Sequence, residues 1–310
     1  MKGERTHIVV NLTDRLGNQL FQFAAAQQLE LDGASVVFSD RTDKPFGGLA
    51  EGPARLERFT GAKLLIASPL QELATGYLPQ TNVRSPRLGM VLRAPIVLPT
   101  IRRIFRPTCF EPRPTTLPIW SRYRIQAYFQ HRSWFDRSLA SVLNQIEIAT
   151  HDARIQFPTF DLCVSLRRGD YVGFGCDLSF DYYVRSLELM VDRSITSVVV
   201  TSDDRLAAHA FSEFLRSKGY DACTSNDVNV EDDREADDPI DPVLRDFCLI
   251  ANSRNLIMSN STFCWWAAEL GDVVAVGSKV RIVAYPRGWI EFQDDESDGL
   301  VRPEWTVVPT

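Results

Sequence analysis

Residues 163–172 read CVSLRRGDYV, and this stretch decides how the whole chain is interpreted. An apolar run ends at Leu166, two arginines follow, and a glycine then interrupts the strand pattern. Because side chains alternate along a strand, Ser165 and Arg167 share one face, and Leu166 points to the other. If the core lies on the Leu166 side, Arg167 leaves the strand end on the opposite face. There its guanidinium can bind a phosphate through two N–H groups.

The second arginine and the residues after it allow other interpretations. We expect Arg168 to pair with a carboxylate such as Asp170 and so to hold the loop. Arg168-Gly169-Asp170 is also a tripeptide that elsewhere serves as a cell-adhesion ligand, and a surface turn with solvated charges is a further alternative. Adhesion is disfavoured because the tripeptide follows a buried strand in a chain with no recognisable export signal.

The alternation of apolar runs and amphipathic segments around this stretch predicts a parallel α/β protein. Expected strands cover 7–12, 34–40, 123–130, 161–166, 197–204, 254–259 and 279–286, and expected helices cover 17–33, 133–146, 180–192, 205–219, 241–253 and 261–271. The proline-rich residues 105–118 are expected to be irregular. We predict two Rossmann-like domains, 1–150 and 151–310, which face a central cleft. Ligands of such sheets bind beyond the carboxyl ends of the strands.

Two further motifs stand at such positions. In DRLGNQLFQFAAA (14–26), Gly17 follows a strand and opens a helix, whose first backbone N–H groups favour anions. Asn18 and Gln19 would offer side-chain donors there, although this motif on its own is explained better by an ordinary loop and helix cap. In LIMSNSTFCWWAAEL (256–270), a strand leads directly through Asn260-Ser261-Thr262 into a helix, which makes a second cradle for an anion.

Composition excludes several classes of protein. The 310 residues are 45% hydrophobic and 24% charged, and the net charge of −6 argues against a nucleic-acid-binding protein. No apolar stretch approaches the roughly 20 residues of a membrane helix, so we expect a cytoplasmic protein without an integral membrane segment. The six cysteines are scattered, which fits reduced thiols better than disulfides or a zinc site.

Familiar metal and nucleotide motifs are absent from the sequence. It contains no Asp-x-Asp pair, no His-Glu-x-x-His and no glycine-rich P-loop or dinucleotide signature. The four histidines are dispersed and show no metal-ligand spacing. We therefore expect no metal and no other cofactor, with arginine side chains and helix N-termini replacing a cation at a bound phosphate.

Taken together, the three motifs resemble those of the α-1,2-fucosyltransferases of glycosyltransferase family 11. That family carries G-[GR]-L-G-N-Q-[ML]-F-Q-[YF]-A, then H-x-R-R-G-D-Y, then S-N-S-[ST]-F-S-W-W-[GA]-A. This chain has DRLGNQLFQFA, VSLRRGDY and SNSTFCWWAA in the same order, spread over residues 14–268. The resemblance implies a GT-B fold and metal-independent, inverting transfer of L-fucose from GDP-β-L-fucose. The acceptor would be the 2-hydroxyl of a terminal galactose in a glycan, which gives an α-1,2 linkage.

The resemblance also assigns roles to residues. Arg167 and Asn18 would act at the reaction centre, with Arg167 on the donor diphosphate, and Asp246 would pair with the guanine edge. The residues implied for donor binding are Arg167, Arg168, Ser165, Asp246, Asn260, Ser261, Thr262 and Gly17. No motif residue stands out as the general base that the acceptor hydroxyl needs in principle, and Asp14, Asp170 and Asp203 are weak candidates.

Two departures from the family pattern leave alternatives open. Ser165 replaces a frequent histidine, and Asp14 replaces the first glycine of the N-terminal motif. Another nucleotide sugar or linkage on the same fold therefore stays an alternative, as does a non-catalytic glycan- or nucleotide-binding protein. The expected partners are GDP-fucose and a galactoside acceptor, and a peripheral contact with a lipid-linked glycan is compatible with this prediction. The acceptor glycan and the oligomeric state do not follow from the sequence.

Overall fold

The structure is a computed structural model that divides into two compact units. It describes residues 5–40, 52–75, 104–106, 112–117, 122–151, 155–190, 194–232, 239–274, 281–288 and 300–310. The units divide between Gln145 and Ile146, inside a helix, where the sequence predicted a boundary at residue 150. The resemblance implies that the N-terminal domain binds the acceptor and the C-terminal domain binds the GDP-sugar, and both roles stay predictions.

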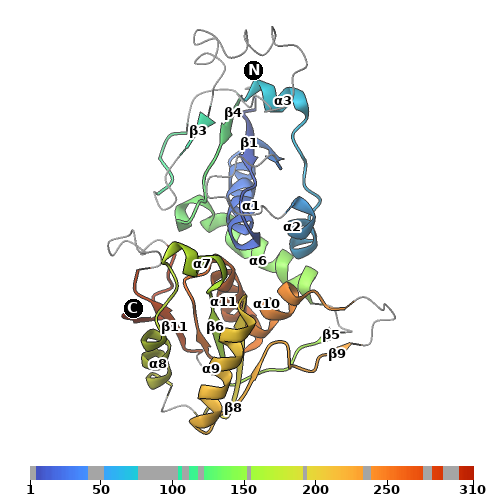
Figure 1. The fold of residues 1–310 in the computed structure, drawn as a ribbon. Helices are drawn as coiled ribbons and strands as arrows, with labels where there is room; N and C mark the ends of the chain where they lie inside the picture. The colour runs from blue at the N-terminus through green and yellow to red at the C-terminus, as the bar shows by residue number, and fades with distance from the viewer. Residues whose placement is uncertain are drawn as a thin grey trace. The chain divides into compact units, whose positions relative to one another are not determined.

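The N-terminal unit is built on a four-stranded parallel sheet with the order β2-β1-β4-β3. Its elements are β1 (His7–Asn11), α1 (Leu16–Leu31), β2 (Ser35–Ser39), α2 (Pro53–Thr60), α3 (Pro69–Ala74), β3 (Ile104–Phe105), β4 (Arg122–Ile125), η1 (Arg132–Trp134) and α6 (Asp136–Thr150). Helix α1 is rich in alanine, glutamine and leucine and is buried along most of its length, where it packs on the sheet (Figure 1).

The predicted strand 123–130 is too long at its C-terminal end. Strand β4 ends at Ile125, which pairs with Val10, and β1 itself ends one residue later at Asn11. The chain then leaves the sheet, and the fully buried Phe129 adopts a left-handed backbone with φ of 57°. An aromatic residue rarely adopts this conformation, so no local pattern would have predicted it.

The C-terminal unit contains a six-stranded parallel sheet with the order β12-β11-β10-β6-β7-β8. Its elements are β5 (Ile155–Gln156), β6 (Leu162–Leu166), α7 (Gly169–Phe174), α8 (Phe180–Glu188), β7 (Ser197–Ser202), α9 (Arg205–Ser217), β8 (Asp221–Thr224), β9 (Glu231–Asp232), α10 (Pro242–Asn252), β10 (Leu256–Ile257), α11 (Thr262–Val274), β11 (Val283–Pro286) and β12 (Thr306–Val308). Counted from β6 within this sheet, the order from its β8 edge is 3-2-1-4-5-6, the Rossmann topology. The predicted α/β class with two Rossmann-like units is confirmed.

Strand parity places the residues of β6 against helices on both faces of this sheet. Val164 and Leu166 belong to the core cluster with Tyr182 of α8 and Phe211 of α9. Ser165 points the other way, toward the Cys264 thiol of α11. The parity prediction is therefore correct, but the face opposite the Leu166 side is covered rather than open, and all five residues of β6 are buried.

A carboxylate ties together the starts of β6 and β7. Asp161 accepts hydrogen bonds from the backbone N–H and the hydroxyl of both Thr196 and Ser197, and it pairs with Arg254 at 2.6 Å. Burial raises the pKa of the Asp161 carboxyl, but these hydrogen bonds outweigh burial and hold the pKa well below its usual range. The group is thus an ionised structural anchor.

Two expectations about the whole chain concern cysteines and membrane helices. In the described residues no cysteine forms a disulfide, and Cys109 lies outside them. Across the same ranges, no helix has both the length and the apolar character needed to cross a bilayer.

Candidate active site

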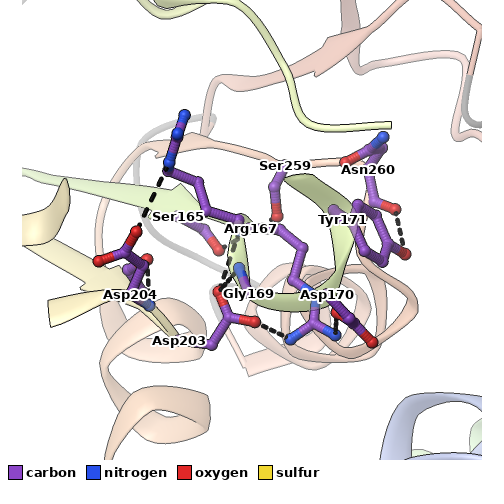
Figure 2. Close-up of polar contacts among 11 residues, drawn as sticks. Ser165, Arg167, Gly169, Asp170, Tyr171, Asp203, Asp204, Ser259 and Asn260 are labelled. Carbon is purple, nitrogen blue, oxygen red and sulfur yellow. Dashed lines mark hydrogen bonds and ion pairs between the residues drawn. The ribbon is translucent and has the colours of Figure 1, made fainter. Parts of the chain in front are cut away.

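The second and third sequence motifs meet at the point where the strand order of the C-terminal sheet reverses. Strands β6 and β10 are neighbours, and Leu256 and Ile257 of β10 pair with Cys163 and Val164 of β6. Because both strands run in the same direction, the residues that follow them emerge at one edge of the sheet (Figure 2). Open α/β sheets bind their ligands beyond the carboxyl ends of the strands at such a switch point.

Arg167, the first residue after β6, is held from three sides. Its Nη2 donates to Asp170 Oδ1 at 2.6 Å, and its Nη1 donates to Asp203 Oδ2 at the end of β7. The guanidinium carbon lies 4.9 Å from the centre of the Tyr171 ring, a cation–π contact. The side chain keeps 15% of its surface exposed, so an anion can still reach it.

Arg168 pairs with a carboxylate, as expected, but its partner is not Asp170. Arg168 forms an ion pair with Asp177 at 3.0 Å and lies 3.7 Å from Asp204, whereas Asp170 forms an ion pair with Arg167. The physical reason is the short helix α7, which begins at Gly169 and was not predicted. The chain turns into this helix directly after Arg168, which brings the Asp170 carboxylate of its first turn back to Arg167.

Asp203 is the residue whose role the sequence did not indicate. Its Oδ1 accepts hydrogen bonds from the backbone N–H groups of Arg168 and Gly169 at 3.0 and 3.1 Å (Figure 2). A Cβ atom on Gly169 would lie 3.0 Å from Asp203 Cγ and closer still to Oδ2. The sequence named Asp203 only as a weak candidate base, and its position in TSDD, at the end of an expected strand of the same sheet, was a further signal.

The other side of the site is the loop from β10 into α11. Asn260 is 3% exposed, and its Nδ2 donates to the carbonyl of Cys176 at 2.8 Å. The Tyr171 hydroxyl donates to the Asn260 carbonyl at 3.3 Å and so joins this loop to α7. Ser261 and Thr262 are partly exposed at the start of α11. The N-terminus of a 13-residue helix therefore lies beside the loop that carries Arg167, and it favours an anion.

Ser165 and Asp246 lie deeper in the same unit. Ser165 is 6% exposed, and its Oγ lies 3.4 Å from Ser259 Oγ. Burial raises the pKa of the Asp246 carboxyl of α10 to about 6, with a further increase from the Asp203 charge. A hydrogen bond with Ser225 and the Arg245 charge lower it, but they do not offset the burial. Such a carboxyl changes its charge just below neutral pH.

Gly17 and Asn18 lie in the N-terminal unit, in the first turn of α1. Asn18 Oδ1 accepts a hydrogen bond from Gln130 Nε2 at 3.0 Å, which links the start of α1 to the segment after β4. Asp14, in the loop before α1, has a left-handed φ of 59°, a conformation that costs glycine nothing. The assignment of Gly17 and Asn18 to the reaction stays a prediction.

The arrangement combines a partly exposed guanidinium, a helix N-terminus and a deeper carboxyl at one sheet edge. These groups can bind the two ends of a nucleoside diphosphate, the phosphates by positive charge and the base by a carboxylate. No group of histidine, cysteine, aspartate or glutamate with metal-binding geometry occurs in the described ranges.

Two units with parallel α/β sheets fit the GT-B fold predicted from the sequence. A model of glycosyl transferase family 11 matches residues 119–308, which is more than half of the chain. The chain belongs to this family.

Comparison with known proteins finds distant relatives. The O-antigen biosynthesis glycosyltransferase WbnK of Escherichia coli is 23% identical over 322 residues, which cover 95% of this chain and 98% of WbnK. Among solved structures, the E. coli heptosyltransferase WaaC with ADP is similar with a TM-score of 0.46 and 10% identity, over 98% of this chain and 93% of WaaC. The fucosyltransferase NodZ from Bradyrhizobium gives a TM-score of 0.42 at 12% identity, over 86% of this chain and 94% of NodZ.

Proposed function

We propose that this glycosyltransferase moves L-fucose from GDP-β-L-fucose to the 2-hydroxyl of a terminal galactose, with inversion at the anomeric carbon and no essential metal. The observation that carries the proposal is the partly exposed Arg167 guanidinium beside the N-terminus of α11, at the switch point of a Rossmann-like sheet. Membership of family 11 supports fucose as the transferred sugar.

The chemistry is a single displacement at the anomeric carbon of fucose. The bond to the departing GDP breaks as the acceptor oxygen attacks, and negative charge develops on the diphosphate. Arg167 and the backbone N–H groups at the start of α11 stabilise that charge where a metal ion would otherwise act. Groups that are already fixed in place before the reaction need no reorganisation during it, which makes them efficient.

The proton of the acceptor hydroxyl needs a destination. Asp170 and Asp203 are both paired with Arg167, and both carboxylate oxygens of Asp203 accept hydrogen bonds. Because these oxygens already accept hydrogen bonds from Arg167 and from the backbone after β6, we do not assign the role to either residue. The proton goes to the departing phosphate or to Asp14, whose loop precedes α1.

The acceptor we propose is a galactose-terminated oligosaccharide of a bacterial surface polysaccharide, carried on a lipid. This proposal is supported by the relative WbnK, an O-antigen biosynthesis glycosyltransferase of E. coli. A cytoplasmic location and a peripheral contact with the membrane surface stay predictions from the sequence. Acceptor choice is assigned to the N-terminal unit, because all the residues implied for donor binding except Gly17 come from the C-terminal one.

The test is transfer from a panel of nucleotide sugars to galactosides, with and without EDTA. Transfer from GDP-fucose that survives EDTA supports the proposal, and exclusive use of a UDP-sugar would overturn it. Tight glycan binding without turnover from any donor would indicate a binding protein instead. Linkage analysis of the product by NMR decides between α-1,2 and other linkages.

Arg167→Ala is the matching variant, and we expect it to lower kcat/KM by roughly 10²- to 10³-fold, as loss of one charge-stabilising donor does elsewhere. Arg216→Ala is a matched control, because Arg216 pairs with Glu213 on the exposed side of α9. Near-normal turnover of Arg167→Ala would contradict the assignment of Arg167 to the diphosphate.

A further inference from the structure

We propose that Asp203 is the positioning residue of the donor site: its carboxylate holds Arg167 and the start of α7 in the arrangement that receives the diphosphate. The inference rests on the proposed function, since it assumes that Arg167 binds the donor. It gives a role to a residue outside the three sequence motifs, and it explains why Gly169 is a glycine.

The hydrogen bonds of Asp203 account for both of its oxygens. Oδ1 accepts from the backbone N–H groups of Arg168 and Gly169, and Oδ2 accepts from Arg167 Nη1 (Figure 2). One side chain at the end of β7 therefore fixes the backbone after β6 and the side chain that leaves it. These residues are 34 to 36 positions from Asp203 in the sequence and meet only because β6 and β7 are neighbours.

The ion pairs of Arg167 with Asp170 and Asp203 leave some of its N–H groups for a ligand. A guanidinium has five N–H groups, and the side-chain hydrogen bonds of Arg167 to described residues use one at Nη1 and one at Nη2. Three N–H groups remain for phosphate oxygens, and Asp170 and Asp203 fix the plane in which they lie. A free arginine side chain loses rotamer entropy when it binds a ligand, and part of that loss has already occurred here before the donor binds.

Gly169 is the second observation that points to this role. A Cβ atom there would lie 3.0 Å from Asp203 Cγ and nearer to Oδ2, so the carboxylate would have to move away from Arg167. The backbone of α7 at this position does not itself require glycine, because Gly169 is not among the residues with positive φ. The close approach of Asp203 is therefore the reason for a glycine in this place.

The negative charge of Asp203 also repels a diphosphate. Removal of this charge could therefore strengthen donor binding, whereas removal of the hydrogen bonds should misalign Arg167. Three donors surround the carboxylate and compensate its charge locally, whereas a loosened Arg167 would lose its alignment with the leaving group. The charge on the diphosphate grows in the transition state, so misalignment lowers kcat more than it raises KM. We therefore expect the loss of Asp203 to reduce turnover, not to improve donor binding.

The experiment measures steady-state transfer from GDP-fucose by Asp203→Asn and Gly169→Ala. Both variants should lose roughly tenfold or more in kcat, while KM for GDP-fucose changes by no more than about threefold. Asp221→Asn removes the same charge at the exposed start of β8 and serves as the control. Thermal unfolding of each variant shows whether the protein remains folded, and Gly169→Ala tests the role with the charge intact.

A double variant separates positioning from other roles. If Asp203 acts through Arg167, then Asp203→Asn causes no further loss of kcat in the Arg167→Ala background. Additive losses would mean an independent role, as base or as structural support, and would overturn the inference. So would normal kcat in Asp203→Asn. If Arg167→Ala itself retains activity, the proposed function fails first; if it loses activity while Asp203→Asn does not, only this inference fails.

Discussion

The Asp246 carboxyl offers a prediction that links folding stability to donor binding. Burial raises its pKa from 3.8 to about 6, so the folded protein holds this proton more tightly than the unfolded chain does. The ionised carboxylate therefore destabilises the fold above pH 6, and the penalty disappears as the pH falls toward 4. The difference between the two pKa values corresponds to roughly 3 kcal/mol at most.

Asp246→Asn keeps the size of the side chain and removes the charge. At pH 8 we expect the free energy of unfolding to rise by roughly 2–3 kcal/mol, because the pKa of about 6 already includes the Ser225 hydrogen bond and the asparagine Oδ1 can still accept it. At pH 4 the variant and the parent should be nearly equal. Urea unfolding at pH 4, 6 and 8 measures both differences.

The same substitution should weaken the binding of GDP, because the proposed contact with guanine needs an ionised carboxylate as acceptor. For the parent protein, protonation at pH 5 should raise the dissociation constant of GDP roughly tenfold over its value at pH 8. The variant should bind GDP at least about tenfold more weakly at pH 8 and show no such pH dependence, which calorimetric titration can follow. Asp221→Asn is again the control for charge. An Asp246→Asn protein with unchanged stability and unchanged GDP affinity at pH 8 would refute the reasoning.

Two further predictions concern stability. Asp161→Asn should lower the midpoint of thermal unfolding at pH 7. The difference in midpoint between the variant and the parent should shrink below about pH 4, because a carboxyl with a depressed pKa stabilises the fold only while it is ionised. A difference that is constant with pH would contradict this. Asp14 has a left-handed backbone, so Asp14→Gly should change the free energy of unfolding by no more than about 0.5 kcal/mol, whereas Asp14→Val should lower it by about 1–2 kcal/mol. Equal values for the two variants in urea unfolding would count against a strained position.

Local patterns in the sequence determined much of the framework. The period-two alternation in CVSL correctly placed Val164 and Leu166 in the core, and the run of alanine, glutamine and leucine predicted α1 to within two residues. The three motifs also gave the loops that follow β1, β6 and β10. These signals are local because they depend only on how a strand or helix orients successive side chains.

Tertiary structure decided the chemistry of the site. The sequence singled out Arg167, but it named Asp203, 36 residues away, only as a weak candidate base and not as the partner of Arg167. It gave Asp170 as an example of a partner for Arg168, whereas Asp170 pairs with Arg167. It could not show that burial raises the pKa of Asp246, or that Gly169 makes room for a carboxylate. Each of these depends on which strands are neighbours, and here the order 3-2-1-4-5-6 brings β7 and β10 to either side of β6. A strand's own sequence specifies its faces, but its neighbours are selected by the packing of the whole sheet.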